Sequence, residues 1–264
     1  MKTTINDIVV ILPLHVVNKN VAELLPKAID SVPEGMEVRV SCANGISDEV
    51  KKIIGKRKGV VIYEDENKDS SNCFQKLVNQ AIEGTKWFSI LEYDDTYNTD
   101  VWSRNVVQYL NEMPNVSVLM CFEDLVNSKD GKFIGMGNDA PWASSFSDEM
   151  GYLDIDSLMS YFDFYLTGSV FNTDDWNSVG GLKESMKLTF WYEFLLRLVN
   201  LGKKVYVMPK VGYTHILGRE NSLIENYKAE IDNEEAEWWF SLARKEYFFK
   251  EDRGKQYVKT EKEE

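Results

Sequence analysis

The sequence predicts an α/β fold with a doubly wound, mostly parallel central sheet and helices on both of its faces. Two observations predict this class. Short β-branched segments alternate with amphipathic helical segments along the first 100 residues. The segments at 8–14 and 87–91 are apolar at nearly every position, as in strands that are buried on both faces. The 264 residues are enough for one large domain of this kind.

In the first half, a helix follows each of the first three predicted strands. Strands are expected at 8–14, 37–42, 60–63 and 87–91, and helices at 18–31, 47–54 and 70–83. Pro33 and Gly35 end the first helix, and Ser70 or Ser71 caps the third. The carboxyl ends of the strands in such a sheet open on one crevice. We therefore expect the loops after the four strands to converge in one site.

The second half is less regular. We expect helices at 101–110 and 190–198, a short helix that is capped at 173–176 and stops at Gly180-Gly181, and an amphipathic segment at 154–164. We expect strands at 116–122, 166–171 and 205–209, and a hairpin turn at 128–132 that leads into 133–135. The segment 137–147, which contains Trp142, is either an ordered connection or a mobile lid over the site. Residues 221–249 form a helical region with a dense aromatic stripe. This stripe should be buried against the main domain or, as the less favoured alternative, in a homodimer.

Composition excludes several classes of protein. The net charge of −13 and the pI of about 4.8 argue against non-specific binding to nucleic acid or anionic membranes. Cys42, Cys73 and Cys121 are isolated, which predicts no zinc site and no disulfide framework and favours a cytoplasmic location. We expect no leader peptide and no integral membrane span, because no apolar run approaches about 18 residues. No glycine-rich phosphate loop follows a strand, which argues against nicotinamide enzymes, P-loop nucleotidases and nucleotidyltransferases.

The most informative stretch is the acidic end of the strand at 87–91. Glu92, Asp94 and Asp95 follow the buried strand directly, and such clustered carboxylates repel one another unless a cation lies between them. Mg²⁺ and Mn²⁺ prefer oxygen ligands of this type, usually together with substrate phosphates. The alternative is an acidic loop that caps the following helix, with Asp100 as its N-cap.

Two further groups of polar residues are candidates for function. His215 is one of only two histidines and shares a short segment with Arg219 and Ser222. A histidine in this company is either a ligand or a structural residue. Glu193 and Arg197 are four residues apart on a predicted helix, and the alternative to a functional role is a plain surface ion pair.

The motifs, taken in order, resemble those of family-2 glycosyltransferases of the GT-A fold over roughly residues 5–222. The resemblance rests on the strand that ends in Pro13, on Asn44-Gly45-x-Ser47-Asp48-Glu49, on Asn79-x-Ala81-Ile82, on Leu91-Glu92-Tyr93-Asp94-Asp95 at the family's Asp-x-Asp position, on Gly180-Gly181-Leu182-Lys183-Glu184 and on Glu193-x-x-x-Arg197. The helix around Glu193 and the tail from His215 to Ser222 are also similar to glycosyltransferase-like proteins encoded by large tailed phages.

The resemblance implies an enzyme that moves a sugar from a nucleoside diphosphate sugar, UDP-sugar foremost, to an acceptor hydroxyl with inversion. Residues 1–100 would be the donor half, 101–218 the acceptor half of the same domain, and 219–264 a helical extension. The implied donor-binding residues are Pro13, Leu14, Asn44, Asp65, Glu92, Asp94, Arg219 and Ser222. Asp94, Asp95 and His215 would hold Mn²⁺ or Mg²⁺, which neutralises the departing diphosphate and gives Asp95 a catalytic role.

The chain departs from the family on the helix that contains Arg197. Inverting members have Glu-Asp before the arginine, with the Asp as general base, whereas this chain has Phe190-Trp191. The base is then Glu193, with Asp175 and Glu184 as alternatives.

The acceptor side of the implied site is defined by aromatic residues. Trp191 and Trp142 are the expected acceptor-binding residues, because an aromatic face suits a sugar ring. The implied acceptor is a glycan, a protein or a modified base. With a modified base as acceptor, the chain would be a phage-encoded enzyme that modifies DNA bases in the host cytoplasm. A non-catalytic protein that binds nucleotide or glycan is the alternative favoured by the missing Glu-Asp pair.

Overall fold

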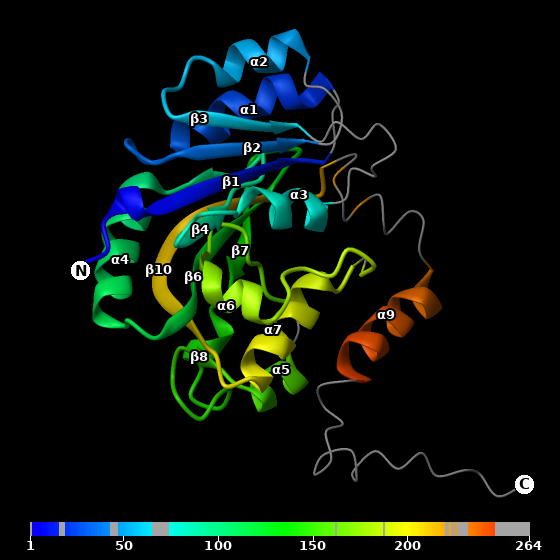
Figure 1. Cartoon of the computed structure of the whole chain (residues 1–264). Coiled ribbons are helices and arrows are strands. Elements are labelled where there is room, and N and C mark those ends of the chain that lie inside the picture. Colours follow the sequence, from blue (N-terminus) through cyan, green and yellow to red (C-terminus); the bar gives the residue numbers. More distant parts are fainter. Residues whose placement is uncertain are drawn as a thin grey trace, which may run out of the picture.

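The computed structural model describes residues 2–15, 19–42, 47–64, 74–161, 163–186, 188–219, 222, 225 and 232–245. Its strands are β1 (Ile8–Leu14), β2 (Val38–Cys42), β3 (Val60–Glu64), β4 (Trp87–Ile90), β5 (Thr96–Tyr97), β6 (Val116–Asn127), β7 (Phe133–Gly137), β8 (Tyr152–Leu153), β9 (Val170–Asn172) and β10 (Lys204–Leu217). They form one sheet in the order β3-β2-β1-β4-β9-β6-β10-β5, with β7 on β6 and β8 on β10 (Figure 1).

The sheet has two parallel blocks, β3-β2-β1-β4 and β6-β10, which the antiparallel strand β9 joins. β1 runs parallel to β2 and β4, β2 to β3, and β6 to β10. β5, β7, β8 and β9 run antiparallel to their neighbours. The predicted mostly parallel sheet is confirmed, and one continuous sheet joins the two halves of the chain.

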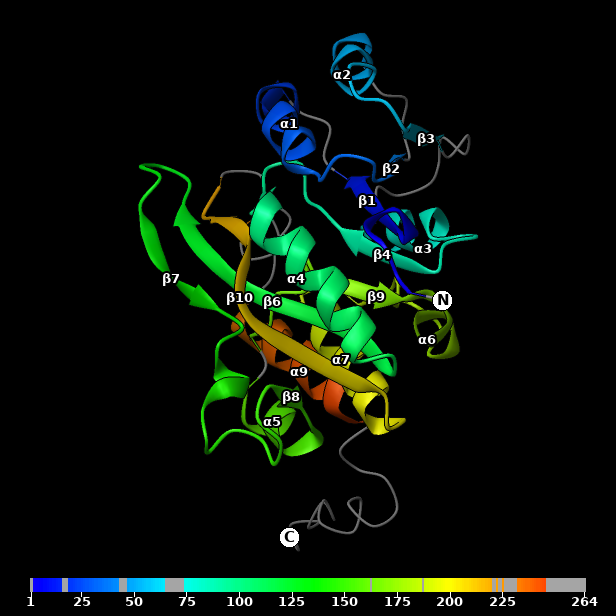
Figure 2. The ribbon, with the colours of Figure 1, turned by 90° about the vertical axis from the view of Figure 1, so that its left-hand side faces the viewer.

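Helices cover both faces of the sheet, as predicted. They are α1 (Lys19–Ser31), α2 (Asp48–Ile54), α3 (Phe74–Ala81), α4 (Thr99–Glu112), α5 (Ile155–Ser160), α6 (Thr173–Ser178), α7 (Phe190–Asn200) and α9 (Asn233–Lys245), with short 3₁₀ helices η1 (Ile5–Asp7) and η2 (Ala140–Trp142). α1 and α3 lie on opposite faces of the sheet (Figure 2). Leu25 of α1 belongs to the same core cluster as Val10, whereas Phe74 of α3 belongs to a second cluster with Ile11. Adjacent residues of β1 thus enter different cores, which explains why the whole strand is apolar.

The long pair formed by β6 and β10 extends further than the sequence predicts. The expected strand ended at Pro209, but β10 continues to Leu217 and remains paired with β6, with a shift of register between Met208 and Val211. Proline has no N–H for the ladder, so an irregularity at Pro209 lets the strand continue. The continuation carries His215 beside the end of β4.

Two connections in the second half also differ in detail from expectation. β9 is shorter than the expected strand at 166–171, because Gly168 adopts φ +73° and its N–H bonds to Ile90 O at 2.7 Å. The segment 137–147 is an ordered connection. Asn138 Nδ2 donates to Cys121 O at 3.0 Å and to Tyr165 O at 2.8 Å, and these bonds hold the segment against the domain.

The C-terminal helix α9 packs against α7, which confirms part of the prediction for the aromatic stripe. Trp239 is 8% exposed, and its carbonyl accepts a hydrogen bond from Thr189 Oγ1 at 3.3 Å. Arg244 Nε donates to Tyr192 OH at 3.1 Å. Trp238, in contrast, is 54% exposed, so the stripe is not buried throughout. No helix in the described part of the chain is long and apolar enough to cross a membrane.

Candidate active site

Three elements bring ionisable side chains together at the carboxyl edge of the sheet. The turn after β4 is closed by a hydrogen bond from Asp95 N to Glu92 O at 3.2 Å. β10 passes beside this turn and carries His215, and its neighbour β6 carries Glu123. The parallel arrangement of β4, β6 and β10 therefore places residues far apart in sequence around one point.

Asp95 ties the acidic turn to β10. Its Oδ1 accepts a hydrogen bond from Ile216 N at 2.9 Å, and its Oδ2 lies 2.9 Å from His215 Nδ1. Glu123 Oε2 lies 3.9 Å from the same ring nitrogen. Burial alone would lower the pKa of His215, but the charges of Asp95, Glu123 and Glu92 outweigh burial and raise it to about 10. The imidazolium thus balances part of the negative charge of the cluster.

Asp94 is bound by a second cation. Arg219 Nη2 lies 2.7 Å from Asp94 Oδ2, and Arg219 Nη1 donates to Tyr93 OH. The guanidinium also lies over the Tyr93 ring at 4.6 Å from its centroid. Asp94 Oδ1 is buried and has no hydrogen-bond donor among the described residues. Burial and the neighbouring Asp95 raise the pKa of Asp94 although Arg219 opposes them.

A cavity of about 520 Å³ opens beside the acidic turn. Glu92, Asp94 and His215 line it together with aromatic residues of α7 and of the segment before β9. Trp191 is among these aromatics and stacks against Phe171 with an interplanar angle of 10°. A cavity lined by both acidic and aromatic side chains suits a sugar that is attached to a charged group.

The cavity includes only some of the residues predicted for the site. Ser222 lines it together with the acidic turn, and Arg219 is in contact with Asp94. Pro13 and Leu14 lie in the last two positions of β1, buried and paired in register with β2. Asn44 and Asp65 lie outside the described residues.

Two predictions concerning neighbouring elements are not supported by the structure. Trp142 is not among the residues that line the cavity. Its side chain packs elsewhere, with its ring 6.2 Å from the ring of Tyr206 and its indole N–H donating to Val207 O at 2.8 Å. Asp100 is not the N-cap of the following helix, since α4 begins at Thr99 with Asn98 as the capping position. The acidic turn therefore has no capping role through Asp100.

Glu193 lies in a closed ion pair on α7. Its side chain is 2% exposed, and Arg197 contacts both carboxylate oxygens, with Nε at 2.8 Å and Nη2 at 2.7 Å. Lys183 Nζ approaches the same carboxylate at 2.9 Å. Glu193 is absent from the residues that line the cavity. This geometry is that of a structural ion pair.

Two residues of this region were given no role by sequence reasoning. Glu123 is fully buried, and neither of its carboxylate oxygens has a hydrogen-bond donor among the described residues. Its signal was a carboxylate directly after an apolar strand, as at Glu92. His15 follows β1 with 5% exposure, its ring 5.5 Å from Phe74, and burial lowers its pKa to about 4. His15 is therefore neutral, unlike His215.

The donor set allows a divalent metal only in combination with a substrate. The described residues contain no group of three or more His, Cys, Asp and Glu side chains placed to hold a metal on their own. Asp94 has a free buried oxygen, and His215 lines the same cavity. Magnesium and manganese in phosphate-transfer sites commonly use one or two protein ligands and complete their shell with phosphates. The residues fit that mode of binding.

These observations define an α/β protein with an acidic strand end that opens on a ligand-sized cavity. No protein-family model matches the chain, and no curated protein sequence matches it. Solved structures do. The mannosyltransferase PcManGT from Pyrobaculum calidifontis, in complex with GDP-Man and Mn²⁺, has a TM-score of 0.62 at 12% identity, covering 91% of this chain. This chain spans 64% of the length of that protein.

S. aureus TarS, as its 1–349 fragment, is also similar. The structure in complex with UDP-GlcNAc has a TM-score of 0.58 at 14% identity, and the structure in complex with UDP has 0.56 at 17%. Both comparisons cover 97% of this chain and 78% of the other. The chain therefore has the GT-A fold of these glycosyltransferases, as the sequence resemblance predicts.

Proposed function

We propose that the protein is a glycosyltransferase that takes a sugar from a nucleoside diphosphate sugar and transfers it to an acceptor hydroxyl. The observation that carries the proposal is the acidic end of β4, which lines a cavity of about 520 Å³ in a GT-A fold. Solved proteins of similar fold hold GDP-Man, UDP or UDP-GlcNAc. We propose that the donor is a UDP-sugar and that the protein acts in the cytoplasm.

The two halves of the sheet divide the work in this proposal. Residues 1–100 bind the donor, with Pro13, Leu14, Asn44 and Asp65 near the nucleoside and Glu92 on the ribose or the sugar. Arg219 and Ser222 bind the diphosphate. Residues 101–218 bind the acceptor, and 219–264 form an extension that contributes α9.

A divalent metal, Mn²⁺ or Mg²⁺, is held in this proposal by Asp94 and His215. When bound, it neutralises the charge that develops on the departing diphosphate. Asp95 takes a supporting role rather than the direct one expected from the sequence, because both its oxygens already contact β10. A carboxylate on the far nitrogen of a ligating imidazole fixes the ring and its tautomer.

Inversion requires a base that removes the proton of the acceptor hydroxyl. The ion pair with Arg197 makes Glu193 a poor base, and Asp175 is paired with Lys203 outside the cavity. Asp163 and Glu225 line the cavity, and we propose that one of them is the base. Trp191 remains the proposed platform for the acceptor sugar.

Product analysis tests the proposal. Each of several UDP- and GDP-sugars is incubated with protein and Mn²⁺, and release of nucleoside diphosphate is followed with and without simple sugar acceptors. Slow release that requires Trp191 and the acidic turn supports a transferase. Binding of nucleotide without any release of diphosphate would support the non-catalytic alternative.

For a modified DNA base as acceptor, the net charge of −13 weighs against tight contact with a duplex.

A further inference from the structure

The C-terminal helix α9 contributes to the cavity of the candidate active site. Phe240 of α9 lines this cavity together with Phe190, Trp191 and Tyr192 of α7. The side chain of Phe240 is half-buried, and its ring lies 6.0 Å from the ring of Tyr192. Because α9 lies beyond residues 5–222, where the resemblance to the family is found, Phe240 adds to the cavity a residue that this resemblance does not cover.

α9 is held to α7 on both sides of Phe240. Just before it in the sequence, Trp239 O accepts a hydrogen bond from Thr189 Oγ1 at 3.3 Å. One turn after it, Arg244 Nε donates to Tyr192 OH at 3.1 Å. Phe240 is therefore fixed at the cavity before a ligand binds, which reduces the entropy cost of binding.

The hydroxyl groups of the lining residues 188–192 are already hydrogen-bonded. Tyr192 OH donates to Leu158 O at 2.7 Å, and the hydroxyl of Thr189 is bonded to the backbone of α9. A sugar ring placed against Phe240 would bring several hydroxyl groups, and each that lost its water without a new partner would cost free energy. An apolar group gains free energy from burial at the same place. The part of the cavity beside α9 therefore suits an apolar group.

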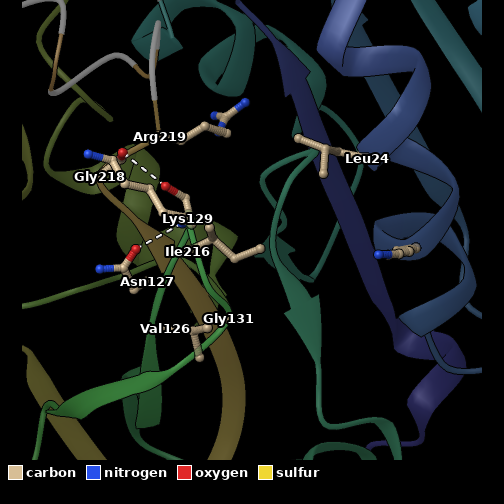
Figure 3. Close-up of a pocket in the computed structure, with 10 residues that line it drawn as sticks. Leu24, Val126, Asn127, Lys129, Gly131, Ile216, Gly218 and Arg219 are labelled. Atoms are coloured by element: carbon tan, nitrogen blue, oxygen red, sulfur yellow. Dashed lines mark hydrogen bonds between the residues drawn. The ribbon is translucent and has the colours of Figure 1, made fainter.

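A second hollow next to the same strand end is lined differently. It has a volume of about 400 Å³ and lies between Leu24 of α1 and the β6–β7 turn with Lys129 (Figure 3). Ile216 and Gly218 line both hollows, but none of the described residues that line this second one is aromatic. A ligand with a flat apolar group is therefore expected in the cavity beside α9.

We propose that the acceptor carries an apolar aryl or alkyl group and that Phe240 of α9 binds this group. The inference rests on the proposed function and narrows the acceptor to a class of hydroxyl compounds with an apolar substituent. In this arrangement Trp191 stacks on the ring that bears the acceptor hydroxyl, and Phe240 contacts the apolar group. Phe240 is thus a residue that determines specificity for the acceptor.

The test is titration of the full-length protein with methyl and phenyl β-D-glucopyranoside, in the presence of UDP and Mn²⁺, followed by ligand-detected NMR. The two glucosides differ only in their apolar group. We expect the wild type to bind the phenyl glucoside about tenfold more tightly than the methyl glucoside. In Phe240→Ala this preference should fall to about twofold or less. Phe240→Leu keeps an apolar side chain on α9, and its preference should lie between these two values.

Trp238→Ala is the matched control. Trp238 is a larger aromatic residue of the same helix, but it is 54% exposed and is not among the residues that line the cavity. This variant should keep the preference of the wild type. A role of Phe240 in packing alone would weaken the binding of both glucosides equally, so the preference separates contact with the ligand from packing.

Binding of UDP is measured first and separates failure of this inference from failure of the proposed function. If the wild type binds UDP, then equal affinity for the two glucosides, no binding of either, or an unchanged preference in Phe240→Ala would overturn the inference alone. If the wild type does not bind UDP, the proposed glycosyl transfer is contradicted, and the acceptor role of Phe240 with it.

Discussion

Two buried groups of charges in this protein differ in how completely they are paired. On α7, Glu193 and Arg197 form a bidentate pair that engages both carboxylate oxygens. In the cluster around the end of β4, Asp94 retains a buried oxygen without a donor, and Glu123 of β6 retains two, within the described structure. Both groups are almost inaccessible to water. The first is closed, whereas the second has free coordination positions.

The difference teaches how to separate structural from functional charges. A buried ion pair with all its hydrogen bonds made holds two elements together and has nothing left for a ligand. A cluster in which burial and like charge raise the pKa values of Glu92 and Asp94 is costly, and such cost is common at sites that bind cations or substrates. Incomplete pairing, more than acidity, marks the end of β4 as the site.

Replacing Glu193 or Glu123 with glutamine should have very different effects on stability, and the larger effect is expected at Glu193. Glu193→Gln leaves the Arg197 guanidinium buried without its counter-charge, so we expect the free energy of unfolding to fall by roughly 3–5 kcal/mol. Urea denaturation at pH 7 measures it. The double variant Glu193→Leu/Arg197→Met, which removes both charges, should recover much of this loss. A loss below about 1 kcal/mol for Glu193→Gln would show that the pair is not closed.

The metal response should depend on pH in the open cluster. Asp94 and His215 both have raised pKa values, so each holds a proton to higher pH than usual, and a metal must displace these protons. The effect of Mn²⁺ on UDP affinity should therefore increase from pH 6.5 to pH 8.5, by up to about tenfold per pH unit for each proton released. Calorimetry in buffers of different ionisation enthalpy counts these protons. A Mn²⁺ effect that is constant over this range would remove His215 from the ligands.

Glu123→Gln should have the smallest effect. Burial raises the pKa of Glu123 well above its usual value, so its carboxyl keeps a proton to higher pH than a free glutamate does, and glutamine imitates the protonated form. A carboxyl whose pKa is higher in the folded than in the unfolded protein lowers the free energy of unfolding once the pH exceeds the unfolded pKa, and this loss grows as the pH rises further. We expect a change of less than about 1 kcal/mol at pH 6 and a gain in stability from the substitution as the pH increases. A large loss at pH 6 would mean that the ionised carboxylate supports His215.

The sequence was sufficient for the first half of the fold, because apolar β-branched strands and amphipathic helices alternate there without interruption. It was insufficient for β10, since Pro209 is a strand terminator by local rules and only pairing with β6 carries the strand onward to His215. The acidic turn was predicted as a site from local composition. The spacing of Glu193 and Arg197 on one helix predicts their ion pair, but not its burial or the further contact with Lys183. The contribution of Glu123 depends on contacts between strands, and no local pattern contains it.

The central claim is that the open cluster at Asp94 binds a nucleoside diphosphate together with a metal. The most direct measurement is the thermal stability of wild type and Asp94→Asn with UDP, GDP and Mn²⁺, alone and combined. We predict that UDP with Mn²⁺ stabilises the wild type, by about 2.7 kcal/mol at a hundredfold excess over Kd, and that Asp94→Asn stays folded but loses the Mn²⁺-dependent part. Equal stabilisation of both proteins, or no response of the wild type to any nucleoside diphosphate, would contradict the account.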